Sequence, residues 1–131
     1  MNEKIMIIDD EKIVGDMAKI SLEEDGYEVE TFLTAAPALE RLKEVRFDVV
    51  VTDLKMKGMD GLEVLRAVRE MSPQTKVIMI TAFANLDVAI EAIKGDVFDF
   101  FPKPVRIKEL KESIRKALAQ NGGQNGEQPG K

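Results

Sequence analysis

Cysteine and histidine are both missing from this 131-residue sequence. Without cysteine there are no disulfides, no thiol catalysis and no thiolate metal sites. Without histidine there is no Ser-His catalytic pair, no imidazole zinc site and no phosphohistidine on this chain. Any chemistry must therefore use carboxylates, hydroxyls, lysines, backbone groups and a hard metal ion. The absence of cysteine also fits a cytoplasmic protein.

Long apolar runs are missing as well, and no stretch approaches the ~20 residues that a membrane-spanning helix needs. The first residues lead directly into a short apolar segment and lack the layout of a signal peptide. Basic residues are outnumbered by acidic ones, 19 to 24, which argues against a nucleic-acid-binding surface spread over the domain. We therefore expect a cytoplasmic domain that contacts neither a membrane nor nucleic acid directly.

What the sequence does contain is a regular alternation of five apolar segments with five segments of helical periodicity. The predicted strands span residues 4–8, 27–32, 47–53, 76–81 and 97–101. The predicted helices span residues 13–25, 34–45, 62–71, 85–95 and 106–119. Thr34 and Asn85 are placed to cap the second and fourth helices, and Gly26 is placed to end the first.

This alternation predicts a doubly wound α/β fold, because right-handed crossovers between parallel strands place helices on both faces of a sheet. Segment 27–32 alternates Tyr27, Val29 and Thr31 with Glu28 and Glu30, which indicates an edge strand with one solvated face. Residues 120–131 contain no large apolar residue and cannot bury enough surface to fold. We predict one domain over residues 1–119 and a flexible tail or linker over 120–131.

The stretch Phe47–Asp53 is central to the predicted site. Its three consecutive valines are typical of a strand that is buried on both faces. The strand ends at Asp53, on the edge where open α/β sheets bind ligands. Taken alone, this carboxylate is most simply a turn residue.

Other predicted strands also end in polar residues. Asp9 and Asp10 follow the first strand, Thr81 ends the fourth, and Lys103 follows the fifth. The carboxyl ends of parallel strands lie along one edge, so carboxylates, a hydroxyl and an ammonium group converge there. This convergence favours a functional site over a set of unrelated turn residues.

Clustered carboxylates raise one another's pKa unless a cation lies among them. Oxygen ligands of this kind suit Mg²⁺, which is typically held by carboxylates together with waters and phosphate. A carboxylate beside Mg²⁺ can act as a nucleophile toward phosphorus and form an aspartyl phosphate. Lys103 and the Thr81 hydroxyl are then placed to bind the phosphoryl oxygens.

These motifs, in this order, resemble the receiver domain of response regulators in two-component signalling. The resemblance covers about residues 4–119 and is carried by Asp9-Asp10, Asp53, Thr81-Ala82 and Lys103-Pro104. It implies a flavodoxin-like sheet of five parallel strands in the order 2-1-3-4-5. The run Phe98–Pro104 most resembles receivers of the nitrogen-regulatory class.

The resemblance assigns the acidic residues their roles. It implies that Asp53 is the phosphoacceptor and also a metal ligand. Asp10 would bind Mg²⁺ directly and Asp9 through water. The backbone carbonyl of Lys55 would be a further ligand.

The resemblance also implies which residues bind the phosphoryl group and respond to it. Thr81 and the backbone N–H of Ala82 would bind the phosphoryl oxygens, and Lys103 would pair with Asp53 or its phosphate. Phe100 would be the aromatic residue that moves as Thr81 shifts, although the neighbouring phenylalanines are equally suited to the core. The Lys103-Pro104 peptide bond would be cis.

In function, the resemblance implies a phosphorylation-activated switch of a two-component or phosphorelay system rather than a turnover enzyme. A histidine kinase, a phosphotransfer protein or a small phosphodonor would supply the phosphoryl group. The domain would promote its own phosphorylation and slower hydrolysis, and it would change conformation at the face formed by the fourth helix, fifth strand and fifth helix. The signal would pass to an output domain or a partner protein, with homodimerisation as one form of response.

Two departures from the family pattern and three alternatives accompany this interpretation. Met56-Lys57 stands where the family usually has Met-Pro, and Asp96 stands where it usually has Gly. A pseudo-receiver, a binding module that is never phosphorylated, is the main alternative. An aspartyl-phosphate phosphohydrolase is less favoured, because it needs a second acid where Lys55 stands. A flavin-binding domain lacks a phosphate-cradling loop after the first strand.

Overall fold

The computed structural model describes residues 2–123, which form one five-stranded parallel sheet covered by helices on both faces. The strands are β1 (Lys4–Ile8), β2 (Glu28–Phe32), β3 (Val49–Asp53), β4 (Lys76–Thr81) and β5 (Asp99–Pro102). The helices are α1 (Lys12–Glu24), α2 (Ala35–Glu44), α3 (Gly61–Met71), α4 (Leu86–Lys94) and α5 (Ile107–Gly123). The strand order β2-β1-β3-β4-β5 confirms the predicted fold class.

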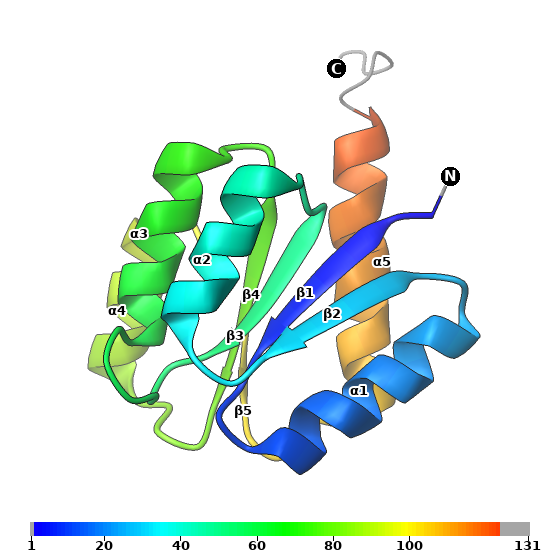
Figure 1. Cartoon of the computed structure of the whole chain (residues 1–131). Coiled ribbons are helices and arrows are strands. Elements are labelled where there is room, and N and C mark those ends of the chain that lie inside the picture. The colour runs from blue at the N-terminus through cyan, green and yellow to red at the C-terminus, as the bar shows by residue number, and fades with distance from the viewer. Residues whose placement is uncertain (1, 124–131) are drawn as a thin grey trace.

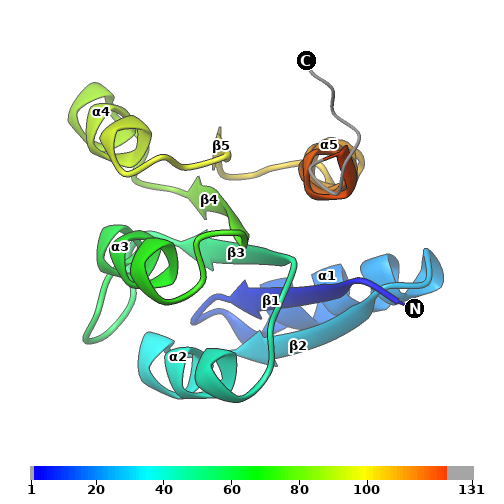
Figure 2. The ribbon, with the colours of Figure 1, turned by 90° about the horizontal axis from the view of Figure 1, so that it is seen from above.

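The helices divide between the two faces of the sheet. Figures 1 and 2 show α1 and α5 on one face and α2, α3 and α4 on the other. Because side chains alternate along a strand, Ile5 and Ile7 pack toward α1 and α5, whereas Met6 and Ile8 pack toward α2 and α3. All five residues of β3 are buried, as expected of a central parallel strand.

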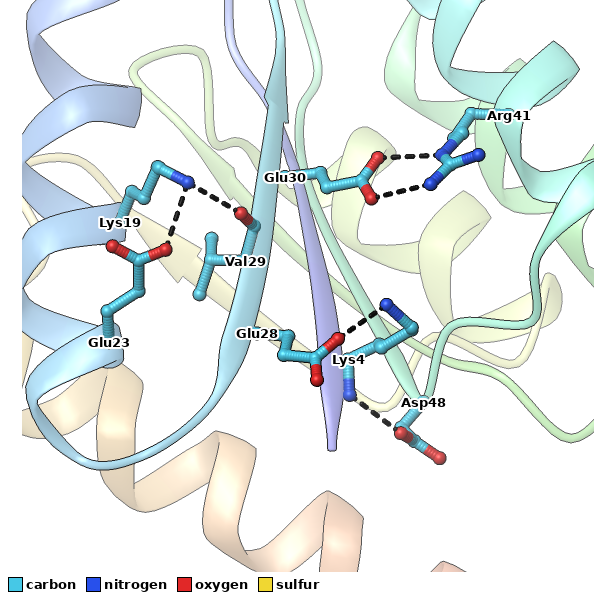
Figure 3. A network of polar contacts seen from close by, with 8 residues as sticks. All are labelled: Lys4, Lys19, Glu23, Glu28, Val29, Glu30, Arg41 and Asp48. Carbon is cyan, nitrogen blue, oxygen red and sulfur yellow. Dashed lines mark hydrogen bonds and ion pairs between the residues drawn. The ribbon is translucent and has the colours of Figure 1, made fainter. Parts of the chain in front are cut away.

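The edge strand β2 is covered by charged side chains (Figure 3). The Lys19 ammonium donates to the backbone carbonyl of Val29 at 2.9 Å and pairs with Glu23. The Arg41 guanidinium donates to both carboxylate oxygens of Glu30, at 2.8 and 2.9 Å. Such charges protect an edge strand from pairing with another chain.

Of the two predicted N-caps, Asn85 is confirmed and Thr34 is confirmed only in its position, while α3 has a cap that was not predicted. Asn85 accepts a hydrogen bond from the backbone N–H of Val88, as predicted. Asp60 and Glu63 form a reciprocal capping box at the start of α3. Thr34 has the extended backbone of a cap, but its side chain makes no capping hydrogen bond within the described residues.

Two boundaries differ from the prediction near the end of the chain. β5 begins at Asp99 instead of Val97, because the turn that ends α4 is longer than expected. In this turn Asp96 has a left-handed φ of 68°, and the Val97 N–H still donates to the Ala92 carbonyl. α5 continues to Gly123, so residues 120–123 of the predicted tail are helical; the remainder, 124–131, lies outside the described residues.

Helical periodicity identified α1 and α4 without identifying their buried sides. Ile13, Met17 and Ile20 on α1 are 72%, 65% and 62% exposed. The same helix buries Gly15, Ala18 and Leu22. On α4, Ala92 is buried, and the large apolar residues left exposed are Leu86, Ile90 and Ile93.

Across residues 2–123, no helix combines the length and the apolar composition needed to span a bilayer.

Candidate functional site

Asp53 lies at the end of β3, between β1 and β4, and the residue as a whole is 6% exposed. Its Oδ1 atom accepts a hydrogen bond from the backbone N–H of Leu54 at 2.7 Å, which orients the carboxylate. The start of α3 packs directly behind this loop, because the Gly61 N–H donates to the Leu54 carbonyl at 2.8 Å. A Cβ atom at Gly61 would lie 2.4 Å from the Asp53 carbonyl oxygen. The backbone that presents Asp53 is thus closely packed.

Asp9 and Asp10 reach the same place from the neighbouring strand. Ile8 pairs with Thr52 in the sheet, so the next residues of the two segments, Asp9 and Asp53, are adjacent. Asp9 is 2% exposed, whereas Asp10 is exposed. Asp9, Asp10 and Asp53 each offer a carboxylate oxygen, and these oxygens all lie within 4.8 Å of one another. The predicted acidic cluster is therefore present in the structure.

Lys103 reaches this cluster from the segment after β5, and its ammonium group contacts three carboxylates. Its Nζ atom lies 2.9 Å from Asp53 Oδ2, 3.0 Å from Asp9 Oδ2 and 3.0 Å from Glu11 Oε1. The Lys103 backbone N–H donates to the Thr81 carbonyl at 2.8 Å, and the Lys103-Pro104 peptide bond is cis. The ammonium group thus links the loops that follow β1, β3 and β5.

Burial and charge act in opposite directions at this cluster. Burial raises the pKa of Asp9, and the Glu11 backbone N–H and the Lys103 ammonium lower it only in part. Burial lowers the pKa of Lys103, but the contacts of its ammonium group with the carboxylates of Asp53, Asp9 and Glu11 outweigh it, and the net shift is upward. The site therefore favours a cation next to its carboxylates.

The donor set fits a hard divalent cation. The contact between Asp9 Oδ2 and Lys103 is an ion pair without hydrogen-bond geometry, and Asp9 Oδ2 is buried without a hydrogen-bond donor from residues 2–123. Buried carboxylate oxygens without donors are expected where a metal ion supplies the missing contact. Asp9, Asp10 and Asp53 are the side chains that would hold it. The Lys55 carbonyl remains a predicted ligand, and the Lys55 ammonium lies 5.4 Å from the Phe83 ring centre.

Thr81 ends β4 and is fully buried. It lies beside the acidic cluster, because the preceding residue, Ile80, pairs with Asp53 in the sheet. Its hydroxyl oxygen accepts a hydrogen bond from the Phe83 backbone N–H at 3.0 Å. The hydroxyl proton remains available for donation to an anion. Ala82 follows as the first, exposed residue of the loop before α4.

Phe100 lies on β5 opposite Met79 and is half-buried. Its neighbours Phe98 and Phe101 both pack against the core that includes α1 and α5. Among the described residues, Phe100 is not part of either core cluster. This difference separates Phe100 from the other two phenylalanines, although its movement stays a prediction.

Sequence reasoning missed Glu11, which contacts Lys103 as closely as Asp9 does. The signal was visible, because Glu11 is the third acid in a row after the first strand. Its role was not deducible, because the contact depends on how two long side chains turn toward each other.

Comparison with known sequences identifies the family pattern directly. A sequence profile described as the response regulator receiver domain matches residues 5–115. The chain is 34% identical over 116 residues to response regulator protein PilR of Pseudomonas aeruginosa, covering 88% of this chain and 26% of PilR. It is 32% identical over 115 residues to the DNA-binding transcriptional regulator NtrC of Escherichia coli, covering 88% and 24%. The chain thus spans about a quarter of the length of these curated relatives.

Solved structures of the same type superpose closely. A CheY-like receiver domain protein from Methanospirillum hungatei has a TM-score of 0.92 at 30% identity, covering 95% of this chain and 99% of that one. TrrA from Thermotoga maritima, solved with Mg²⁺ and BeF, has a TM-score of 0.80 at 29% identity, covering 88% and 99%. The comparisons confirm the resemblance indicated by the strand-end motifs, including its similarity to NtrC.

Proposed function

Because the chain belongs to the response-regulator receiver family, we propose that it is a phosphorylation-activated switch with Asp53 as the phosphoacceptor. The family is one of signalling domains rather than turnover enzymes. The observation that carries the proposal is the Asp53 carboxylate, which lies within 4.8 Å of the oxygens of two further carboxylates and 2.9 Å from a lysine ammonium. The proposed setting is the cytoplasm.

In the proposed step, a carboxylate oxygen of Asp53 attacks phosphorus and forms a new P–O bond. With acetyl phosphate, the P–O bond to acetate breaks and acetate leaves with the electron pair. With a histidine kinase or a phosphotransfer protein, the P–N bond to the donor imidazole breaks, and the leaving imidazole takes up a proton. A bound Mg²⁺ would neutralise phosphoryl oxygens during the transfer.

This chain's own residues position the reacting groups. The Leu54 N–H orients the Asp53 carboxylate, and Lys103 supplies a positive charge next to its other oxygen. From the end of the adjacent strand β4, the Thr81 hydroxyl and the Ala82 N–H would bind the phosphoryl oxygens. Hydrolysis would proceed by attack of water on the same phosphorus, with Asp53 as the leaving group.

The proposed response reaches the face formed by α4, β5 and α5. Lys103 connects Asp53 to this face, because its side chain contacts Asp53 and its backbone N–H donates a hydrogen bond to the Thr81 carbonyl at the end of β4. This face carries exposed Leu86 and Ile93 on α4 and a groove of about 570 Å³ between β5 and α5. Exposed apolar side chains of this kind suit a protein partner, an output domain or a second copy of the chain.

The test is the intact mass of the protein after incubation with acetyl phosphate and Mg²⁺. We expect one added phosphate in the parent and none in Asp53→Asn or in the parent without Mg²⁺. If no adduct forms, binding of beryllofluoride distinguishes a short-lived phosphate from no phosphorylation. A parent protein that neither forms the adduct nor binds beryllofluoride is a pseudo-receiver, and the proposal is then wrong.

A further inference from the structure

The starting observation is that the Lys103 ammonium group is shared among three carboxylates at nearly equal distances. Asp53 Oδ2 lies at 2.9 Å, and Asp9 Oδ2 and Glu11 Oε1 both lie at 3.0 Å. A lysine ammonium group has three N–H donors. Asp53 and Glu11 accept hydrogen bonds from two of them, and Asp9 Oδ2 lies against the same ammonium group as an ion pair. A phosphoryl oxygen that approaches Lys103 must therefore compete with carboxylates that are already in contact with it.

The three carboxylates are not equivalent in their surroundings. Asp9 and Asp53 are 1% and 8% exposed at their side chains and belong to the acidic cluster. The Glu11 side chain is 63% exposed. Water can solvate Glu11 when it leaves Lys103, whereas releasing either buried carboxylate would leave a charge without a partner. Glu11 is thus the partner that Lys103 gives up most readily.

The backbone of Glu11 is held independently of its side chain. Its N–H donates to Asp9 Oδ1 at 2.9 Å, and its carbonyl accepts from the Val14 N–H at 3.0 Å. Glu11 is the N-cap residue of α1, but its side chain makes no capping hydrogen bond within the described part of the chain. Replacing the side chain should therefore leave the loop and the helix start in place.

We propose that Glu11 is a positioning residue that competes with the phosphoryl group for the Lys103 ammonium and so lowers the affinity of the site for that group. This inference rests on the proposed function. In the unphosphorylated domain, Glu11 keeps Lys103 turned partly toward the β1–α1 loop. When a phosphoryl group is attached to Asp53, Lys103 exchanges Glu11 for a phosphoryl oxygen and Glu11 returns to water.

The test is the affinity of the Mg²⁺-loaded protein for beryllofluoride, measured by calorimetric titration. We expect Glu11→Gln to bind about two- to fivefold more tightly than the parent, the range that an exposed ion pair supports. Asp16→Asn is the matched control, because Asp16 is another acid near the start of α1 and pairs with Lys12 instead. It should bind as the parent does.

A double-mutant cycle separates competition for Lys103 from a general charge effect. In a Lys103→Met background, adding Glu11→Gln should leave the beryllofluoride affinity unchanged. In metal-free protein, the NMR resonance of the Lys103 side-chain nitrogen should shift in Glu11→Gln and stay in place in Asp16→Asn. This second measurement reports the contact itself without a bound ligand.

Three results would overturn the inference. Equal affinity of Glu11→Gln and the parent would show that no competition occurs. An affinity gain that persists in Lys103→Met would show a general charge effect. A parent that binds no beryllofluoride and accepts no phosphate would overturn both the proposed function and this inference. The first two results require a parent that binds beryllofluoride, so they overturn the inference alone.

Discussion

At the scale of single residues, close backbone packing behind Asp53 decides what the site tolerates. Gly61→Ala would place a Cβ atom 2.4 Å from the Asp53 carbonyl oxygen and 2.8 Å from Leu54 Cα. Neither backbone atom can move without disturbing the end of β3. We expect the free energy of unfolding to fall by about 1–3 kcal/mol, as for overpacked sites, in urea titrations.

Gly15→Ala is the matched control for Gly61→Ala, because it is also a buried glycine in a helix. There, an added Cβ atom would meet Thr31 at 3.7 Å, an ordinary contact distance. Alanine is the better helix former, so we expect a gain of about 0.5–1 kcal/mol. Equal losses for both variants would contradict the steric explanation.

At the scale of secondary-structure elements, side-chain caps distinguish α3 from α2. Asp60 accepts a hydrogen bond from the Glu63 N–H at 2.9 Å, and the Glu63 carboxylate accepts one from the Asp60 N–H. Asp60→Ala should therefore lower the unfolding free energy by about 1 kcal/mol. Thr34→Ala should have a smaller effect, because the Thr34 side chain makes no such bond within residues 2–123. Thermal unfolding of both variants tests the difference, and a Thr34→Ala loss as large as that of Asp60→Ala would contradict it.

At the scale of the whole molecule, topology explains which features the sequence could predict. Asp9, Asp53 and Lys103 were predictable as neighbours, because parallel strands bring their carboxyl ends to one edge whatever the side-chain details. The Glu11–Lys103 contact was not, because it depends on the rotamers of two flexible side chains. The exposed stripe on α1 was misleading for another reason. Helical spacing shows that Ile13 and Met17 share a face, but the packing of smaller residues against the sheet decides which face is buried.

The acid stability of the whole molecule depends in part on the pair that joins α2 to the edge of the sheet (Figure 3). Hydrogen bonds from Arg41 lower the pKa of Glu30 in the folded protein, against a smaller opposing effect of burial. The stability that this pair contributes is fully present above the unfolded-state pKa of Glu, about 4.3. It is lost as the pH falls through the lower folded-state pKa.

Glu30→Gln should therefore be less stable than the parent at pH 7, and the difference should shrink as the pH falls from about 5 toward 3. Urea unfolding across this range, with parent and variant side by side, measures the difference directly and cancels the contributions of all other acids. Glu44→Gln is the control, because Glu44 makes a single exposed contact with the same Arg41, and its effect should be smaller. A Glu30→Gln difference that stays constant down to pH 3 would mean that the loss comes from packing and not from the charge of Glu30.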